Sequence, residues 1–539
     1  MSIPGVLYAC HFYIRHFTEG IPQHHCRIQN QTSAESLFSR DGRHGDLLRV
    51  SIPMDKAGKP EMCLRFTEPQ WQLLNANVTE EARLATEDCL DGWVYDKSVF
   101  LSTIVTEWDL VCGQKLLKST ALIMLSAGQL AGSLVFGILS DRFGRRTILM
   151  CTTLMVTITG TCAAFVPTFA AYAILRFLTA AALIGANITK NCLTLEWTPI
   201  ERRVLVNASN VYAYSLGQIL LAAWAYLVRD WRWLQFSTSV SYGIIFLFSM
   251  ALPESARWLI SHNKLHMAVK TLQKVAWING QKEEGRKLTP DGIMSHIQED
   301  LETVKSTSHF RDLFQTPGIC KISLCIVSLW FTTGFSVYGI LLDFQKFGIT
   351  IYLVQVLFAI IDLPVKLLVS ISMSYLGRRF TLIFLEIFSG FVIIIDIFVP
   401  QDMTVLRMIL AVLGKGSLAG ALSCLLLYTL ELYPTEIRQM GMSVGNTAMI
   451  TGNLFSSIFH ITGHYIPILP SVVSAMVPIL SAIAASFLFE TNGLQLLETI
   501  QETENRVKRP QSQKGNVSED VQEQPTLLLA EMTQAEDSV

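Results

Sequence analysis

Charged side chains are scarce in this chain. Asp, Glu, Lys and Arg make up 16% of the 539 residues, whereas an ordinary soluble domain carries about 25%. There are 42 Lys and Arg against 44 Asp and Glu, so the chain lacks the basic surplus that binds nucleic acid. A glycine-rich phosphate loop and an HExxH motif are also absent from the sequence. These absences argue against a soluble enzyme and against a nucleic-acid-binding protein.

Histidine and cysteine do not form a metal-binding motif. The 11 histidines are scattered, and the local cluster His24-His25-Cys26 has no further ligand at zinc-site spacing. We therefore predict no metal, no bound cofactor and no enzymatic activity.

Apolar residues, in contrast, are abundant. They make up 50% of the chain and occur in blocks of about 20 residues, the length that spans the hydrocarbon of a bilayer. Backbone groups in lipid must bond within their own segment, so the blocks predict helices and an all-α membrane protein embedded in the lipid bilayer. Eleven spans are predicted, at residues 119–139, 147–166, 168–195, 204–227, 233–252, 320–343, 350–373, 380–399, 404–430, 441–463 and 466–489.

Arginines in the short loops predict the orientation. Those near residues 142–146, 202–203, 378–379 and 438 follow the first, third, seventh and ninth predicted spans, and therefore lie on one side of the membrane. The positive-inside rule assigns that side to the cytoplasm. The predicted regions are an extracellular loop at 18–118, an N-terminal helical bundle at 119–253, a cytoplasmic linker at 254–319, a C-terminal helical bundle at 320–489 and a disordered cytoplasmic tail at 490–539.

The predicted extracellular loop carries the marks of an oxidised, glycosylated segment. Its sequons lie at Asn30 and Asn77, and it holds four cysteines, which allow three pairings that the sequence leaves open. The cysteines predicted to form disulfides are Cys26, Cys63, Cys89 and Cys112.

The two halves of the chain resemble each other. Gly144-Arg145-Arg146 recurs as Gly377-Arg378-Arg379, Arg176 is matched by Arg407, and the pair Glu196 and Arg203 is matched by Glu431 and Arg438. Repeated halves in a helical membrane protein predict two bundles that rock about a site near the middle of the membrane.

Several motifs resemble a known family. Residues 137–146 are similar to the signature loop of the major facilitator superfamily, and residues 89–96, 106–112, 253–259 and 431–439 resemble the organic anion transporters of solute carrier family 22. The resemblance implies a plasma-membrane, multi-pass secondary transporter of small organic anions, such as steroid sulfates and aromatic carboxylates. It also implies alternating access, with anion exchange or uniport as the coupling. The oligomeric state stays open.

Two lysines are candidates for binding the anion. Lys366 and Lys415 lie inside predicted helices, where an ionisable group is costly and therefore a functional candidate. The alternative is that Lys366 merely pairs with Asp362 on the same helix face, or that either lysine extends its amine towards the membrane surface. The resemblance adds aromatic candidates that would line the cavity, unless they only pack between helices. These are Tyr212, Tyr214, Trp330, Phe331, Phe335 and Tyr338.

The resemblance also assigns a gating role to the charged loops. They would form clusters that hold the outward-open state and separate as the halves rock, although positive loops could also act as topological anchors alone. The residues concerned are Asp141, Arg145, Arg146, Glu196, Arg203, Arg378, Arg379, Glu431 and Arg438.

The N-terminal segment departs from the family pattern. Residues 1–17 form a short segment in place of the first helix, and only Gly5 to Tyr13 are mostly apolar, far short of about 20 residues. A first bundle of five helices, apparently lacking the first transmembrane helix, is therefore expected. The alternative function that follows is a non-transporting family member that acts, if at all, as a membrane partner protein.

Overall fold

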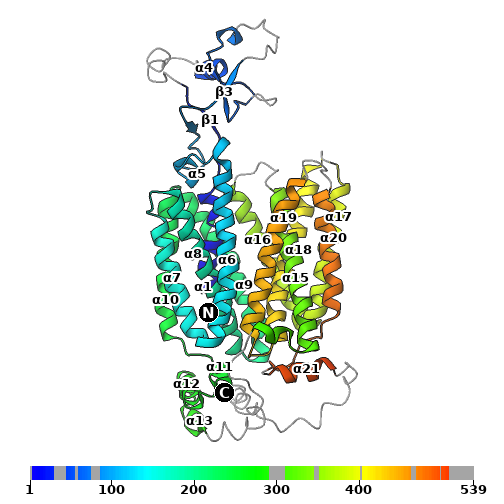
Figure 1. The fold of residues 1–539 in the computed structure, drawn as a ribbon. Coiled ribbons are helices and arrows are strands. Elements are labelled where there is room, and N and C mark those ends of the chain that lie inside the picture. The colour runs from blue at the N-terminus through cyan, green and yellow to red at the C-terminus, as the bar shows by residue number, and fades with distance from the viewer. Residues whose placement is uncertain are drawn as a thin grey trace.

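The computed structural model describes residues 3–28, 44–54, 59–74, 85–290, 310–344, 351–400, 403–462, 469–497 and 499–508. Two bundles of long helices stand side by side, a small loop domain projects from one end, and short helices cover the other end (Figure 1). We call the end with the loop domain (within residues 24–114) the loop-domain end, and the end with the short helices (within residues 256–314 and 500–508) the linker end. Asn30 and Asn77, the predicted glycosylation sites, lie outside the described residues.

The first bundle contains five long helices and a short one. The short helix α1 (Ile3–Tyr13) is continued by α2 (Arg15–Thr18). The long helices are α6 (Lys115–Phe143), α7 (Arg145–Ala163), α8 (Phe169–Glu196), α9 (Arg203–Leu227) and α10 (Trp231–Ala251), with a 3-10 turn at Ile200–Arg202 before α9.

The second bundle repeats this arrangement. Its helices are α15 (Pro317–Phe344), α16 (Ile351–Tyr375), α17 (Arg378–Phe398), α18 (Thr404–Leu432), α19 (Arg438–Thr462) and α20 (Leu469–Ser486). Helix α6 packs on α8 as α16 packs on α18, and α7 packs on α8 and α10 as α17 packs on α18 and α20. The predicted repeat is therefore present in the packing as well as in the sequence.

Each of the eleven predicted spans coincides with one of these long helices. Within the described residues, 9 helices are long and apolar enough to cross a membrane. Helices α9 and α19 are equally long but more polar, and they lie where the halves meet: α9 packs on α16, and α19 packs on α6. Asn207 of α9 donates to Ser423 O, and Thr447 of α19 shares a hydrogen bond with Ser133. Their polar faces are thus satisfied by the opposite half.

The N-terminal segment adds a short helix to the five long helices expected in the first bundle. Helix α1 packs on α9 just as α15, the first helix of the second half, packs on α19. The contact is close, since a Cβ at Gly217 would lie 2.3 Å from Val6 O. The helical stretch from Ile3 to Thr18 is about 24 Å long at 1.5 Å per residue, against about 30 Å of hydrocarbon. A short helix therefore occupies the place of the first span.

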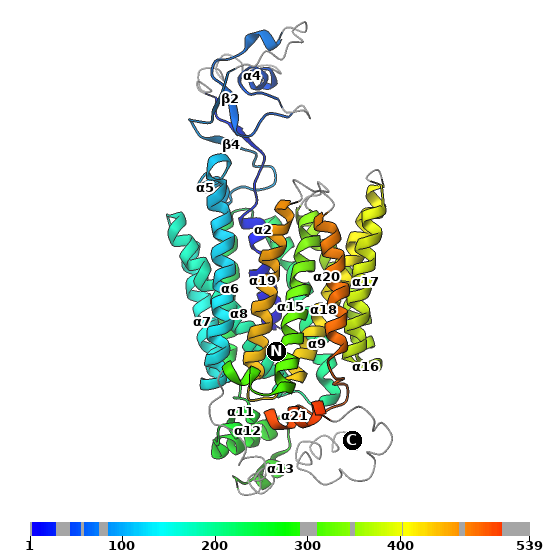
Figure 2. The same cartoon turned by 45° about the vertical axis from the view of Figure 1, so that its right-hand side comes forward.

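The loop domain is built from two small two-stranded sheets and two disulfides. Strand β1 (His24–Cys26) pairs with β4 (Trp93–Tyr95), and β2 (Leu64–Phe66) pairs with β3 (Thr86–Asp88), both antiparallel. Of the three possible pairings, the structure has Cys26 with Cys89 and Cys63 with Cys112. The remaining elements are α4 (His44–Ser51), α5 (Ile104–Glu107) and the 3-10 turns Trp71–Leu74 and Cys112–Gln114. The domain stands above α6 of the first bundle (Figure 2).

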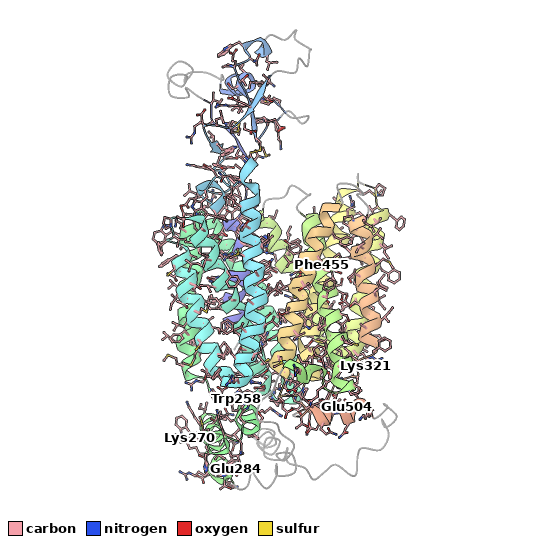
Figure 3. All side chains as sticks on the ribbon, in the orientation of Figure 1. Trp258, Lys270, Glu284, Lys321, Phe455 and Glu504 are labelled. Carbon is pink, nitrogen blue, oxygen red and sulfur yellow. A yellow bond between two sulfur atoms is a disulfide. The ribbon has the colours of Figure 1, made fainter. Side chains whose placement is uncertain are left out.

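Short helices form the linker end. The segment between the bundles contains α11 (Ala256–Ser261), α12 (Leu265–Ile278), α13 (Lys282–Lys287) and a 3-10 turn at Phe310–Phe314. In the tail predicted to be disordered from residue 490, the described residues include helix α21 (Ile500–Lys508), which packs beneath α15 (Figure 3). Leu496 and Leu497 are buried, so apolar contact explains why the chain stays attached there.

Glu504 of α21 caps helix α15. Its carboxylate accepts a hydrogen bond of 2.9 Å from Gly318 N and is buried. A carboxylate at a helix N-terminus contributes about 0.3–1 kcal/mol, and up to about 2 kcal/mol where it is partly buried. We expect Glu504→Gln to lower the thermal stability of the purified protein, whereas Asn505→Ala, at an exposed position of the same helix, should change it little. Equal melting temperatures for the two variants would contradict the capping role.

Candidate functional site

Three buried charges lie together in the middle of the second bundle. Asp362 and Lys366 are one turn apart on α16, and Lys415 comes from the neighbouring helix α18. Lys415 Nζ lies 3.0 Å from Asp362 Oδ1, and Lys366 Nζ lies 3.7 Å from Asp362 Oδ2. The side chains are only 5–12% exposed. We call these three residues the lysine cluster; it carries two cations against one carboxylate.

The lysine cluster reaches across to the first bundle. Lys366 Nζ donates a 2.6 Å hydrogen bond to Ser215 Oγ on α9. The alternative interpretation of the sequence, in which Lys366 only pairs with Asp362, therefore explains only part of the environment of Lys366. Lys415 makes the shorter contact with the Asp362 carboxylate. A buried positive charge without a full counter-charge is costly, so the cluster is suited to receive a negatively charged group.

Aromatic rings surround the two amines. Lys366 Nζ lies 5.7 Å from the centre of the Tyr214 ring, and Lys415 Nζ lies 4.3 Å from that of Phe358. Tyr214 in turn contacts three rings of α1, with centroid distances between 5.6 and 6.4 Å: Tyr8, Phe12 and Tyr13. We call these four rings the Tyr214 aromatic cluster. Its α1 members were missed from the sequence because the segment was taken as too short to span the membrane.

The other predicted aromatic residues lie elsewhere. Trp330 is 2% exposed, belongs to the apolar core of the second bundle and donates to Thr429 Oγ1. Phe335 is buried and contacts Phe459, while Phe331 is half-buried and contacts Phe455. These contacts favour the packing alternative for these three residues. Tyr212 and Tyr338 are half-buried, and the described contacts do not join them to the lysine cluster.

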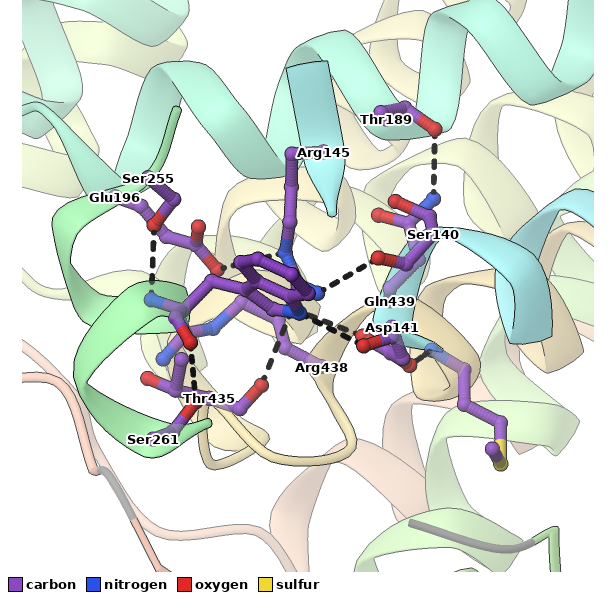
Figure 4. A network of polar contacts seen from close by, with 12 residues as sticks. Ser140, Asp141, Arg145, Thr189, Glu196, Ser255, Ser261, Thr435, Arg438 and Gln439 are labelled. Atoms are coloured by element: carbon purple, nitrogen blue, oxygen red, sulfur yellow. Dashed lines mark hydrogen bonds and ion pairs between the residues drawn. The ribbon is translucent and has the colours of Figure 1, made fainter. Parts of the chain in front are cut away.

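A second group of charges lies at the linker end, on α6, α7 and α8 of the first bundle (Figure 4). Arg145 Nη2 pairs with Asp141 Oδ1 at 2.8 Å, and Arg145 Nε lies 3.6 Å from Glu196 Oε1. All three side chains are nearly inaccessible. The opposite half joins this group, because Asp141 Oδ2 accepts from Met440 N and Arg145 Nη2 approaches Thr435 O at 3.4 Å.

The repeated Glu and Arg residues pair crosswise between the halves. Arg438 of the second half lies 3.4 Å from Glu196 of the first, and Arg203 of the first half lies 3.8 Å from Glu431 of the second. Arg378 holds Glu431 at 3.1 Å from within the second half. The ion pairs form two groups, one around Glu196 and one around Glu431, and we call the two together the linker-end charge cluster. Its members are Asp141, Arg145, Glu196, Arg203, Arg378, Glu431 and Arg438.

Arg146 and Arg379 have a different environment from that predicted. Arg146 Nη2 donates to Met250 O at the end of α10, and Arg379 Nη2 donates to Ser486 O at the end of α20. They therefore satisfy the last carbonyls of a neighbouring helix. The described ion pairs do not connect them to the linker-end charge cluster.

Two glutamates were missed from the sequence. Glu254 accepts from the backbone N–H groups of Arg145 and Arg146, and Glu490 accepts from those of Arg378 and Arg379. Each carboxylate caps the helix that begins after a glycine with positive φ, which is 102° at Gly144 and 90° at Gly377. Extending the sequence repeat from Glu254-Ser to Glu490-Thr would have revealed the pair.

Comparison with known proteins decides the family. The model of the sugar and other transporter family matches residues 79–503. Solute carrier family 22 member 20 of Mus musculus is 42% identical over 516 residues, covering 95% of this chain and 92% of that protein. Member 6-B of Xenopus laevis is 43% identical over 511 residues, covering 94% and 92%. This chain belongs to solute carrier family 22. Organic anion transporter 3 of Mus musculus is 40% identical over 523 residues, covering 96% and 94%.

Solved structures support the fold. The proton:xylose symporter XylE, bound to 6-bromo-6-deoxy-D-glucose, superposes with a TM-score of 0.61 at 18% identity, covering 74% of this chain and 90% of that one. The predicted major facilitator fold is confirmed. As a member of solute carrier family 22, the chain is a multi-pass membrane transporter and not an enzyme, as predicted. The predicted location in the plasma membrane agrees with this membership.

Proposed function

We propose that this solute carrier family 22 member moves organic anions across the plasma membrane by alternating access. The observation that carries the proposal is the lysine cluster, which is buried, holds two cations against one carboxylate and touches both halves of the molecule. Charge of this sign, taken out of water, favours an anionic partner. The similarity to a relative named as an organic anion transporter supports the same substrate class.

The Tyr214 aromatic cluster supplies the second part of the proposed site. Large rings with polar edges offer contact area to the hydrophobic body of a steroid sulfate or an aromatic carboxylate. Lys366 lies against Tyr214, so the charged group and the body of such a substrate would be held side by side. Lys366 and Lys415 would attract the sulfate or carboxylate.

The linker-end charge cluster would hold the halves together at the cytoplasmic end. It contains two ion pairs that cross between the halves, each repeated by the internal symmetry. When the halves rock, these pairs would separate and the substrate would leave towards the cytoplasm. Exchange against an intracellular anion is the coupling we propose. The alternative of a non-transporting partner protein rested on a missing first helix, and the packing of α1 on α9 argues against it.

Uptake by a Lys366→Gln variant tests the substrate class. We expect the KM for a sulfated steroid to rise roughly tenfold, equivalent to about 1.4 kcal/mol, because one binding cation is lost. Surface abundance should hardly change, because Lys415 still faces Asp362 at 3.0 Å. Lys321→Gln is the matched control, since that lysine is exposed near the linker end and away from the cluster (Figure 3).

Two outcomes would count against the proposal. Unchanged uptake by Lys366→Gln would show that the lysine does not contact the substrate. Disappearance of this variant from the surface would show that its contacts with Asp362 and Ser215 are structural. A higher KM for an organic cation in the same variant would contradict the anion preference itself, because removing a positive charge should favour a cation.

A further inference from the structure

A small pocket lies inside the first bundle, apart from the proposed substrate site. It is enclosed by α1, α2, α6 and α8. Its polar lining consists of His11, Arg15, Gln129, Arg176 and Thr179. Neither lysine of the lysine cluster belongs to the lining.

Arg176 presents an incompletely satisfied cation to this pocket. It is 3% exposed, and its Nε and Nη2 atoms have no hydrogen-bond acceptor among the described residues. The nearest acid is Glu19, whose Oε1 lies 3.6 Å from Arg176 Nη2, beyond hydrogen-bond distance. A buried guanidinium normally has acceptors for its N–H groups, so this one is arranged to receive a further acceptor.

A second cation and a histidine face the same space. Arg15 lies against the ring of Phe12 at 5.6 Å. His11 is 2% exposed; its Nε2 contacts Ser239, while Nδ1 has no partner among the described residues. Two arginines against the single carboxylate of Glu19 leave one positive charge in excess. The pocket thus combines surplus charge with unused N–H groups.

The equivalent position of the second half differs from this one in burial. Arg407 matches Arg176, but its Nε lies 3.5 Å from Asp396, and both side chains are a quarter to a third exposed. Arg407 Nε also has no hydrogen-bond acceptor among the described residues, but solvent reaches the side chain. Arg176 is buried and lines a cavity instead.

We infer that this pocket binds a small inorganic anion of the size of chloride. The space within it is about that of one water molecule, which excludes an organic carboxylate. A monatomic anion there would accept hydrogen bonds from Arg176 and face Arg15. It would balance the excess charge and hold α1 and α2 against α8. The site is separate from the lysine cluster and does not depend on which substrate is carried.

Thermal unfolding of the purified full chain, measured without substrate, tests the site. Chloride replaces gluconate at constant ionic strength, and we expect the melting temperature to rise in a saturable manner, since a ligand that binds only the folded state stabilises it. Bromide should act as chloride does. Arg15→Gln should abolish most of this rise, and because Arg15 is half-buried the variant should still fold.

Two matched variants locate the anion. Lys366→Gln and Arg407→Gln should both keep the chloride-dependent rise, since one changes the lysine cluster and the other the equivalent arginine of the second half. Loss of the rise in Lys366→Gln together with its retention in Arg15→Gln would place the anion at the lysine cluster and overturn the inference. Identical melting temperatures in chloride and gluconate for the unmodified chain would show that the pocket holds only water.

Discussion

Replacing Asp362 by asparagine is expected to remove most of the protein from the cell surface. Asp362 is the carboxylate that faces both lysines of the lysine cluster, at 3.0 and 3.7 Å. Without it, Lys366 and Lys415 would be two buried like charges in a medium of low dielectric. Removing one partner of a buried ion pair costs about 3–5 kcal/mol, a large fraction of the stability of a typical protein. Surface labelling and total abundance measure the effect.

A second substitution provides the control for this prediction. The pair Asp362→Asn with Lys415→Met returns the formal charge of the cluster to that of the unmodified chain. Surface abundance should recover, while Lys366 keeps its hydrogen bond to Ser215. Normal abundance of the single variant would show that the lysines do not depend on Asp362. Failure of the double variant to recover would point to packing, rather than charge, as the reason for the loss.

The sequence predicted the long helices because their signal is local. A block of about 20 apolar residues has few alternatives in lipid, and the internal repeat fixed how the blocks are grouped. Helix α1 was not predicted as a bundle helix because its stability comes from tertiary packing: Ala9 in α1, and Ile14 directly after it, are fully buried against neighbouring helices. Length alone therefore underestimated this segment.

The candidate site was predictable residue by residue but not as an arrangement. Lys366 and Lys415 were found because a lysine inside an apolar helix is unusual. Their sharing of Asp362, and the approach of Ser215 from α9, depend on contacts between helices that no spacing encodes. The aromatic candidates show the same limit, since Tyr214 lies beside Lys366 whereas Trp330 lies in the core. Helical spacing does not distinguish a cavity face from a buried one.

The linker-end charge cluster was predicted more completely, because most of its residues belong to the internal sequence repeat. Two copies of the same charged motif on opposite halves suggested a paired role, and the crosswise pairs are the physical form of that repeat. The two copies are not equal. Asp141 has no acidic counterpart at residue 374, which is Ser, and in the second half Thr491 instead donates to Glu431 at 2.6 Å.

This asymmetry leads to the expectation that Arg438→Met opens the linker end far more than Arg203→Met does. Arg438 is fully buried; besides Glu196, it donates to Leu430 O at 2.9 Å and to Leu497 O at 3.3 Å. Its removal leaves these carbonyls without their donor. Arg203 lies 3.8 Å from Glu431 and donates to one carbonyl, Leu494 O, at 3.1 Å. Because Glu431 keeps its pair with Arg378 at 3.1 Å, removing Arg203 leaves fewer buried groups without a partner.

The rate of cysteine modification measures this opening. Cys192 lies one turn before Glu196 on α8 and is fully buried, so a membrane-permeant thiol reagent should reach it only when the linker end opens. The other six free cysteines are replaced by serine or alanine beforehand. We expect Arg438→Met to raise the rate of Cys192 modification at least about tenfold, which corresponds to about 1.4 kcal/mol. Arg203→Met should raise it less.

A lysine substitution separates charge from geometry. Arg438→Lys keeps the positive charge beside Glu196 but loses the planar fork that reaches several carbonyls at once. If the fork matters, its Cys192 modification rate should fall between those of the unmodified chain and Arg438→Met. Equal rates for all three chains would mean that the pair formed by Arg438 and Glu196 does not hold the halves together. A faster rate in Arg203→Met than in Arg438→Met would mean that the second-half copy of the cluster, around Glu431, carries the closure.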